Sequence, residues 1–192
     1  MKKPEQIFSQ TYRRDESADR YAIEIAIDRY SDLFNEWDAA PFRRRELNPE
    51  LETFLMSCSD EIPLRYAIGL YVTIPKAIKD ERREEILREG IDNHFAYKIY
   101  VFRHKLNRSN RKALYCILGG CLLLGVAKIL LISSNHLLPF IFEQGLIIGG
   151  WVFLWEAVSI LFFGNSELYH EYQTYKRLRN MPVIFQVSES HH

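Results

Sequence analysis

Two apolar segments in the C-terminal half of the chain constrain its fold more than any other feature. Residues 113–132 and about 137–163 are each long enough, as helices, to cross the hydrocarbon core of a bilayer, which takes roughly 20 residues. Only the link Ser133-Ser134-Asn135-His136 separates the two segments. The sequence therefore predicts a transmembrane hairpin of two antiparallel helices.

Glycines recur in both segments at positions that an antiparallel hairpin would bring together. Gly120 falls opposite Gly150, and Gly125 falls opposite Gly145. Small residues let helices associate in lipid, although glycine is also common in membrane helices for other reasons. We expect these pairs to pack the hairpin. Gly145 and Gly149 also form a G-x-x-x-G face distinct from the line through Gly150, so one face is free to meet another copy of the chain.

Three ionisable residues lie within the hairpin: Lys128, Glu143 and Glu156. A charge at the bilayer centre costs about 2.5–3.5 kcal/mol on insertion scales. Lys128 and Glu143 lie at similar depth, so we expect an ion pair, with snorkelling of Lys128 or an ion path as alternatives. Glu156 lies level with the basic start of the first segment and is expected to pair there, within or between subunits.

Basic residues flank the hairpin and are absent from its link. The positive-inside rule then places both termini of a multi-pass membrane protein in the cytoplasm. The chain holds 25 basic and 25 acidic residues, and this balance argues against a nucleic-acid partner. We expect the following residues to contact lipid head groups instead: Arg43, Arg44, Arg45, Arg108, Arg111 and Lys112.

The polar remainder of the chain predicts one small α/β (α+β) cytosolic domain with the hairpin inserted into it, so the chain is mostly helical overall. Residues 1–18 are expected to be disordered. Alternation predicts strands near residues 21–27 and 66–74, although a helix also fits the first. Asn48-Pro49 predicts a helix start. A long helix is expected from Asp80 that runs into the first apolar segment with little interruption, and any bend in it would fall at residues 107–110. A helix from Ser166 precedes a strand at 182–187.

These elements define four regions: a disordered arm at 1–18, a cytosolic domain at 19–110, the hairpin at 111–164, and a returning helix and strand at 165–192. The three cysteines imply no disulfide framework. Two helices connect the sheet to the two spans, so we expect a movement of the sheet to be transmitted to both spans.

Motifs for catalysis or for a cofactor are absent from the sequence, including G-x-x-x-x-G-K-[ST], G-x-G-x-x-G, C-x-x-C and H-E-x-x-H. We therefore assign no catalytic, cofactor-binding or metal-binding residue. His94 and His104 are interpreted as surface or interface residues. Asp32 and Asp38, near the three arginines at 43–45, are interpreted as a structural ion-pair network rather than a catalytic acid pair.

The segment EQGLIIGGWVFLW at residues 143–155, together with the spacing of Asp32, Asp38, Pro41 and Arg45, resembles a group of bacterial two-span inner-membrane proteins with no assigned function. The resemblance implies a bacterial inner-membrane protein and carries over no catalytic residue. Where the pattern of that group has a basic residue after the second Trp, this chain has Glu156.

Three functions are compatible with these features. The first is a non-enzymatic membrane protein whose cytosolic domain mediates self-assembly or binds a cytosolic protein, anchored by the hairpin. The second is an oligomeric membrane-perturbing effector or small channel gated by that domain. The third is an enzyme acting at head-group level through residues 32–45, which ranks last because no nucleophile and base stand together.

Overall fold

The computed structural model describes residues 11–133 and 137–188, and it divides into two compact units. The first unit contains the described residues up to Tyr100 together with those from Gln173 onward. The second unit is Val101–Tyr172. The second unit thus lies, in sequence, between the two parts of the first.

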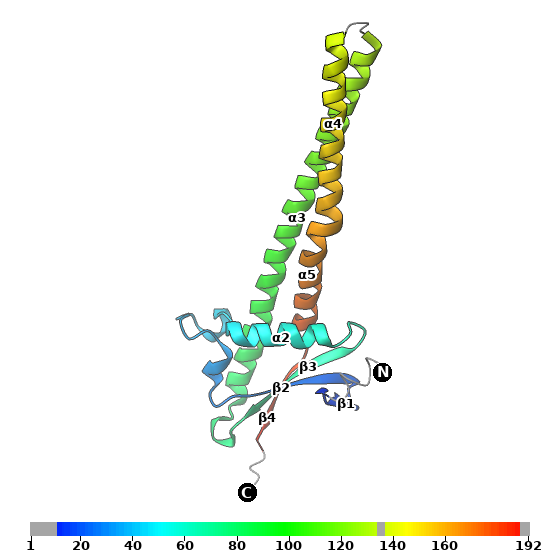
Figure 1. Ribbon diagram of the computed structural model, residues 1–192. Helices are drawn as coiled ribbons and strands as arrows, with labels where there is room; N and C mark the ends of the chain where they lie inside the picture. Colours follow the sequence, from blue (N-terminus) through cyan, green and yellow to red (C-terminus); the bar gives the residue numbers. More distant parts are fainter. Residues whose placement is uncertain (1–10, 134–136, 189–192) are drawn as a thin grey trace. The chain divides into compact units, whose positions relative to one another are not determined.

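A four-stranded sheet forms the centre of the first unit (Figure 1). Its strands are β1 (Arg14–Asp15), β2 (Arg20–Ala26), β3 (Ala67–Ile74) and β4 (Val183–Val187), in that spatial order. β2, β3 and β4 are parallel, whereas β1 is antiparallel to β2. The three expected strands are confirmed, the helical alternative for β2 is wrong, and the C-terminal strand returns to the sheet.

The expectation of a disordered arm is corrected where the structure describes it. Residues 1–10 lie outside the described residues, but β1 pairs with β2. Arg13 Nε lies 3.0 Å from Glu24 Oε1, and the Ala22 amide donates to the Arg13 carbonyl at 2.8 Å. The polar composition of residues 1–18 gave no sign that β1 pairs with β2. A short edge strand forms through backbone hydrogen bonds and does not require apolar side chains.

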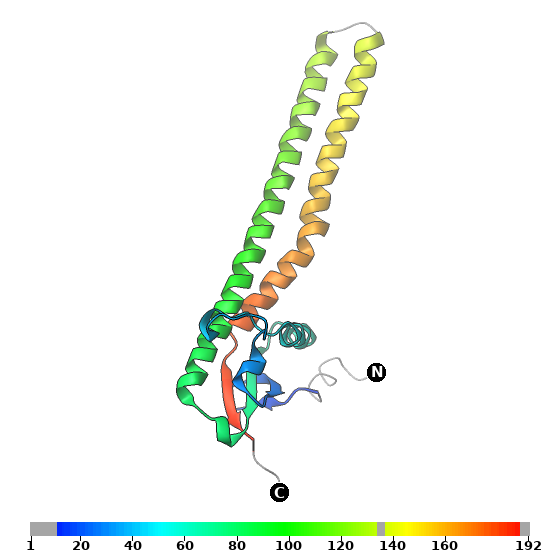
Figure 2. The same ribbon diagram turned by 90° about the vertical axis from the view of Figure 1, so that its left-hand side faces the viewer.

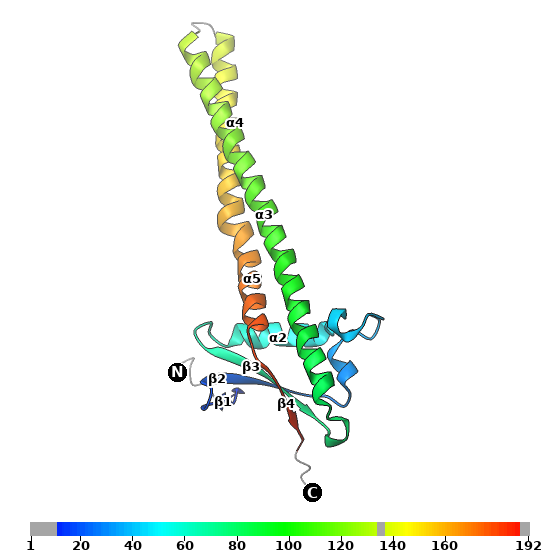
Figure 3. The same cartoon turned by 180° about the vertical axis from the view of Figure 1, so that it is seen from behind.

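Helix α2 (Pro49–Glu61) starts where the sequence predicted (Figure 3). The Asn48 side chain accepts a hydrogen bond from the Glu50 amide at 2.9 Å, and Pro49 needs no amide partner at the first helical position. Short 3₁₀ turns occur in the connections, at η1 (Tyr30–Leu33), η2 (Phe42–Arg44) and η3 (Lys76–Ile78).

The core of the first unit lies on one face of the sheet. Ile23, Leu70, Val72 and Ile74 share that face by register and are at most 1% exposed. The helices add Leu55, Leu87, Ile91, Phe95 and Leu178. The opposite face carries polar groups such as Glu24, Thr73 and Gln186, so the strands alternate as a one-sided sheet does.

The second unit is a pair of antiparallel helices (Figure 2). They belong to α3 (Glu81–Ser133) and α4 (Leu137–Ser159); a π-helical turn, η4 (Ile160–Gly164), joins α4 to α5 (Asn165–Arg179). α3 runs through residues 107–110 as uninterrupted helix, which confirms the expected continuation into the first apolar segment. Both helices are long and apolar enough to cross a membrane.

Candidate functional site

The helices of the second unit meet along a seam of small side chains. α3 contributes Ala113, Cys116, Gly120 and Ala127, and α4 contributes Gly150 and Ala157 together with Glu143. The α4 residues are seven apart, and the α3 residues are three, four and seven apart, which keeps them on one helix face. We call this set the hairpin seam. On α4 the hairpin seam follows the line through Gly150, which the sequence predicted to be distinct from the G-x-x-x-G face of Gly145 and Gly149.

Gly120 and Gly150 form the tightest point of the hairpin seam, as predicted. A Cβ on Gly150 would lie 2.7 Å from Leu124 Cγ and 3.2 Å from the Gly120 carbonyl oxygen. A Cβ on Gly120 would lie 2.9 Å from the Gly150 carbonyl oxygen. Such distances are shorter than van der Waals contact, so the backbones approach this closely because neither position has a side chain.

Gly125 and Gly145 do not pack against each other, which corrects the second predicted pair. A Cβ on either would meet nothing within 4 Å among the described residues. The reason is rotational: Gly125 is two residues before Ala127, and Gly145 is two residues after Glu143, so each points well away from the seam. A Cβ on Gly149 would touch Leu123 Cδ1 at 3.7 Å, an ordinary contact.

The expected ion pair between Lys128 and Glu143 is not formed within the described residues. Glu143 is 5% exposed, and its Oε1 has no hydrogen-bond partner there. Lys128 is exposed. Ala127, not Lys128, faces α4, and one residue further along α3 turns the side chain by about 100°. Equal depth therefore did not imply a shared face.

Glu156 is paired within the chain. Lys112 Nζ lies 3.2 Å from Glu156 Oε1, and both side chains are largely exposed. This confirms that Glu156 meets the basic start of the first apolar segment, and it assigns Lys112 as the partner. Arg108 and Arg111 are exposed neighbours on α3, and their contact with lipid stays a prediction.

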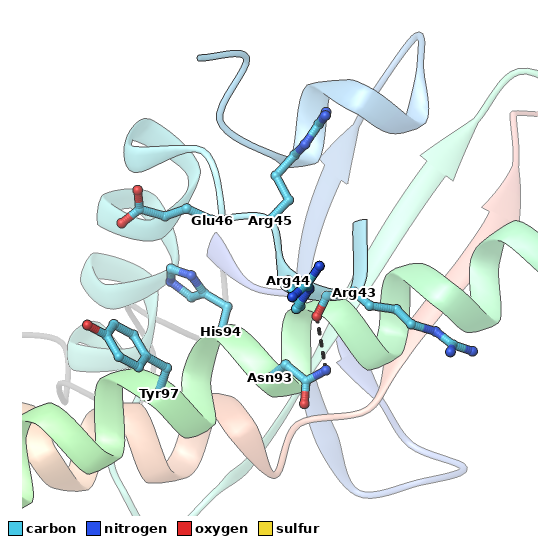
Figure 4. A pocket seen from close by; sticks show the side chains of 7 residues that line it. All are labelled: Arg43, Arg44, Arg45, Glu46, Asn93, His94 and Tyr97. Atoms are coloured by element: carbon cyan, nitrogen blue, oxygen red, sulfur yellow. Dashed lines mark hydrogen bonds between the residues drawn. The ribbon is translucent and has the colours of Figure 1, made fainter. Parts of the chain in front are cut away.

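A basic pocket of about 660 Å³ lies in the first unit (Figure 4). One wall of this pocket is the segment at residues 43–46 and the other is α3. Gly90 lets these walls approach closely, because a Cβ at Gly90 would lie only 2.4 Å from the Phe42 carbonyl oxygen. The Asn93 side chain also donates to the Arg43 carbonyl at 3.0 Å. The pocket is lined by Arg43, Arg44, Arg45, Glu46, Asn93, His94 and Tyr97.

The three arginines of the basic pocket differ in what holds them. Arg43 Nε lies 2.8 Å from Glu89 Oε2. Arg45 donates to the Ala40 carbonyl at 2.9 Å and stacks over the Phe42 ring. Arg44 has no partner among the residues that the structure describes. The pocket can therefore attract an anion mainly through Arg44, and its predicted contact with lipid head groups is untested.

A polar cluster behind the basic pocket was missed by the sequence analysis. Glu52 on α2 receives a hydrogen bond from the Tyr175 hydroxyl at 2.6 Å, and Lys98 Nζ lies 2.9 Å from the same oxygen. His94 Nε2 lies 3.3 Å from the other Glu52 oxygen, while His94 Nδ1 accepts from the Leu47 amide. His94 is 7% exposed, which corrects its interpretation as a surface residue.

Opposing effects set the charge state of Glu52. Burial raises its pKa, but the close approach of His94 Nε2 and the contacts with Tyr175 and Lys98 outweigh burial and lower the pKa to about 2. The carboxylate is thus a stably charged anchor between helices. The i,i+4 spacing of His94 and Lys98 was visible in the sequence, but nothing there indicated that both face Glu52.

The acidic residues near the arginines serve the local fold. The Asp38 carboxylate accepts from the Glu46 and Ala40 amides at 2.8 and 2.9 Å, and these bonds lower its pKa. Asp32 accepts from the Arg29 amide at the start of η1. Backbone amides engage both carboxylates, and Asp32 Oδ1 also lies 3.7 Å from Arg29 Nε. The expected ion-pair network of Asp32 and Asp38 with the arginines at 43–45 is therefore not formed among the described residues. Within the described residues, no group of three His, Cys, Asp or Glu side chains is placed to hold a metal ion.

Comparisons with known proteins add no relationship: no protein-family model matches the chain, and neither the curated proteins nor the solved structures give a significant match. The arguments about function therefore rest on the chain's own residues.

Proposed function

We propose that the chain is a non-enzymatic integral inner-membrane protein whose α/β unit mediates self-assembly or binds a cytosolic partner, with the hairpin as its anchor. The observation that carries this proposal is the outer surface of the hairpin. Large apolar side chains stand exposed along both helices, among them Leu118, Leu122, Ile129, Phe142, Trp151 and Trp155. A continuous apolar surface of this kind in water promotes aggregation, whereas lipid tails solvate it.

Basic residues support an orientation with both termini in the cytoplasm. They lie before the first span and after the second, and the link between the spans contains no Lys or Arg. On this orientation the sheet, α2 and the basic pocket lie in the cytoplasm. The arginines at positions 43–45 are then available to anionic head groups.

Two features of the hairpin support self-assembly. Lys128 is exposed on an otherwise apolar stretch, where a charge needs either a partner or a route to the surface. Gly145 stands in open space on the face opposite the hairpin seam, so another helix can approach it closely. A second copy of the chain satisfies both requirements.

The test is the mass of the particle in mild detergent or in nanodiscs, for the wild type and two leucine variants. Gly145→Leu adds bulk to the proposed assembly face, and Gly125→Leu is a matched control because its Cβ also meets open space. We expect a defined oligomer that Gly145→Leu reduces to monomer and Gly125→Leu leaves intact. A monomeric wild type would contradict self-assembly. Gly149 suits this test less well, because Leu123 already contacts that position.

The second candidate function is an oligomeric membrane-perturbing effector or small channel. Glu143 favours it, because a buried carboxyl without a partner in the described residues resembles the polar groups that line ion paths. Induced expression with a membrane-potential dye separates the candidates. Depolarisation in the wild type that Glu143→Gln abolishes would support the channel. An unchanged membrane potential in the wild type would contradict the channel and favour the anchored, non-enzymatic protein.

A further inference from the structure

A second pocket, of about 570 Å³, lies entirely within the second unit, where α3 faces η4 and the start of α5. Arg103 and Asn110 line it from α3. Leu161 and Phe162 line it from η4, and Asn165 and Ser166 from α5. We call it the π-helix pocket. None of its lining residues belongs to the basic pocket or to the hairpin seam.

The π-helical turn accounts for the space. A π-turn inserts an extra residue into a helix and locally widens it, and such turns are frequent at functional sites. Lys112 pairs with Glu156, but Asn110, only two residues earlier, bonds to Asn165, nine residues after Glu156. The two helices thus lose their regular pairing at η4, and the pocket lies at that point.

The polar end of the π-helix pocket has unused bonding capacity. Asn165 Nδ2 donates to Asn110 Oδ1 at 2.6 Å, but the buried Asn165 Oδ1 has no partner among the described residues. A buried acceptor without a donor destabilises the fold, so a ligand that supplies a donor gains by pairing with it. Arg103 is exposed and has no partner in the described part of the chain. A fitting ligand carries an anionic group for Arg103 and a hydrogen-bond donor for Asn165.

The other wall of the π-helix pocket is apolar. Phe162 is 71% exposed, and Leu161 is 43% exposed beside it. Opposite them, α3 is polar, because residues 107–112 read Asn-Arg-Ser-Asn-Arg-Lys. One wall therefore suits an acyl chain and the other a charged head group, which is the division found within a phospholipid.

We propose that the π-helix pocket binds a glycerophospholipid whose head group contains a hydrogen-bond donor, such as ethanolamine or glycerol. Arg103 holds the phosphate, Asn165 Oδ1 accepts from the head group, and the acyl chain lies along Leu161 and Phe162. The proposal rests on the proposed membrane anchoring, since the pocket is where α3 changes from polar to apolar.

Native mass spectrometry of the full chain in detergent tests this site with added phosphatidylethanolamine, phosphatidylglycerol or phosphatidylcholine. The variants are Arg103→Gln, Asn165→Leu and the control Arg108→Gln, which removes the same charge from α3 outside the pocket. Arg103→Gln should weaken binding of the first two lipids by about tenfold, the size of one charge-assisted hydrogen bond. Arg108→Gln should leave binding unchanged. Asn165→Leu should abolish the preference over phosphatidylcholine, whose head group has no donor.

Four outcomes would overturn the proposal. Equal losses in Arg103→Gln and Arg108→Gln would show a general charge effect. Competition by glycerol 3-phosphate as strong as that by the lipids would show a site for soluble phosphate. Extraction of the wild type from membranes by alkaline carbonate would overturn the membrane anchor itself, whereas retention with no effect of Arg103→Gln would overturn this site alone.

Discussion

The charge of Glu52 makes the first unit sensitive to acid. Its pKa is about 2 in the folded chain, against an ordinary value of 4.5, because three side-chain donors surround it. A carboxyl with a depressed pKa stabilises the fold above its unfolded pKa, and this contribution is lost as pH falls toward its folded pKa. The shift corresponds to a contribution on the order of 3 kcal/mol at neutral pH.

We therefore predict that the urea midpoint of the first unit, followed by proteolysis of the full chain, falls as pH decreases from about 4.5 toward 2. Glu52→Gln should lower the midpoint at pH 7 and flatten this pH dependence. Glu50→Gln is the matched control, because Glu50 is exposed on the same helix outside the cluster. An equal effect of both substitutions would contradict the role given to Glu52.

The glycines of the hairpin yield a second residue-scale prediction. Gly150→Ala places a Cβ 2.7 Å from Leu124 Cγ, so the helices must separate, at a cost of about 1–3 kcal/mol for overpacking. Gly145→Ala places its Cβ in open space and should leave the hairpin intact. The measurement is the SDS concentration that changes the fluorescence of Trp151 and Trp155. Equal midpoints for the two variants would show that the seam does not hold the helices together.

At the scale of elements, one side chain secures the end of α2. The Arg177 guanidinium on α5 donates to the carbonyls of Ser59 and Ile62 at 2.6 and 2.7 Å, and to those of Pro63 and Tyr66 at 3.1 and 2.7 Å. It thereby satisfies carbonyls that the helix end leaves without partners. α5 and the connection from α2 to β3 are joined through this one group.

Arg177→Lys should loosen this connection, because an ammonium cannot present the same planar set of donors. We expect faster amide hydrogen exchange in residues 59–68, with a loss of about 2–3 kcal/mol for the charged hydrogen bonds removed. Arg179→Lys serves as the control, since within the described residues the Arg179 side chain contacts only the Asp92 carboxylate, at 2.9 Å. Unchanged exchange in Arg177→Lys would refute the anchoring role.

How much of the fold was predictable depends on whether the determining signal is local. Alternation identified β3, and Asn48-Pro49 identified the start of α2, because these signals act within a few residues. On α2 the large apolar side chain of Phe54 is 45% exposed, while the charged Glu52 points inward to partners from α3 and α5. Partners distant in sequence therefore decided which side of α2 is buried.

The candidate sites likewise were predictable only where the determining signal is local in sequence. Gly120 and Gly150 could be paired from sequence because the short link fixes the depth of each residue. Lys128 and Glu143 do not pair within the described part of the chain, because the small residue Ala127 occupies the face of α3 that packs against α4 and Lys128 lies off that face. The π-turn at η4 has no composition signal, so the pocket beside it was not anticipated.

At the scale of the whole chain, the hairpin lies in sequence between two strands that pair with each other. β3 bonds in parallel to β4, from Leu70–Val183 through Ile74–Val187, yet the chain forms both apolar helices between them. A parallel pair always needs a long crossover, which here includes the proposed membrane spans. The sheet can be completed only after both apolar helices have been made. If these helices span a membrane as proposed, both flanks of the hairpin end on the same side of it.

This requirement and the positive-inside rule predict the same topology, which cysteine labelling can check. Ser17→Cys lies beside β1, and Asn135→Cys lies in the link between the spans. In intact cells, a membrane-impermeant maleimide should label Asn135→Cys and not Ser17→Cys, and permeabilisation should expose the second. The wild type is the background control, because Cys58 and Cys116 are buried and Cys121 lies within the first proposed span.

Labelling of Ser17→Cys before permeabilisation would place the sheet outside the cell and overturn the orientation. Labelling of neither site in intact cells would place the link inside and remove the hairpin from the membrane.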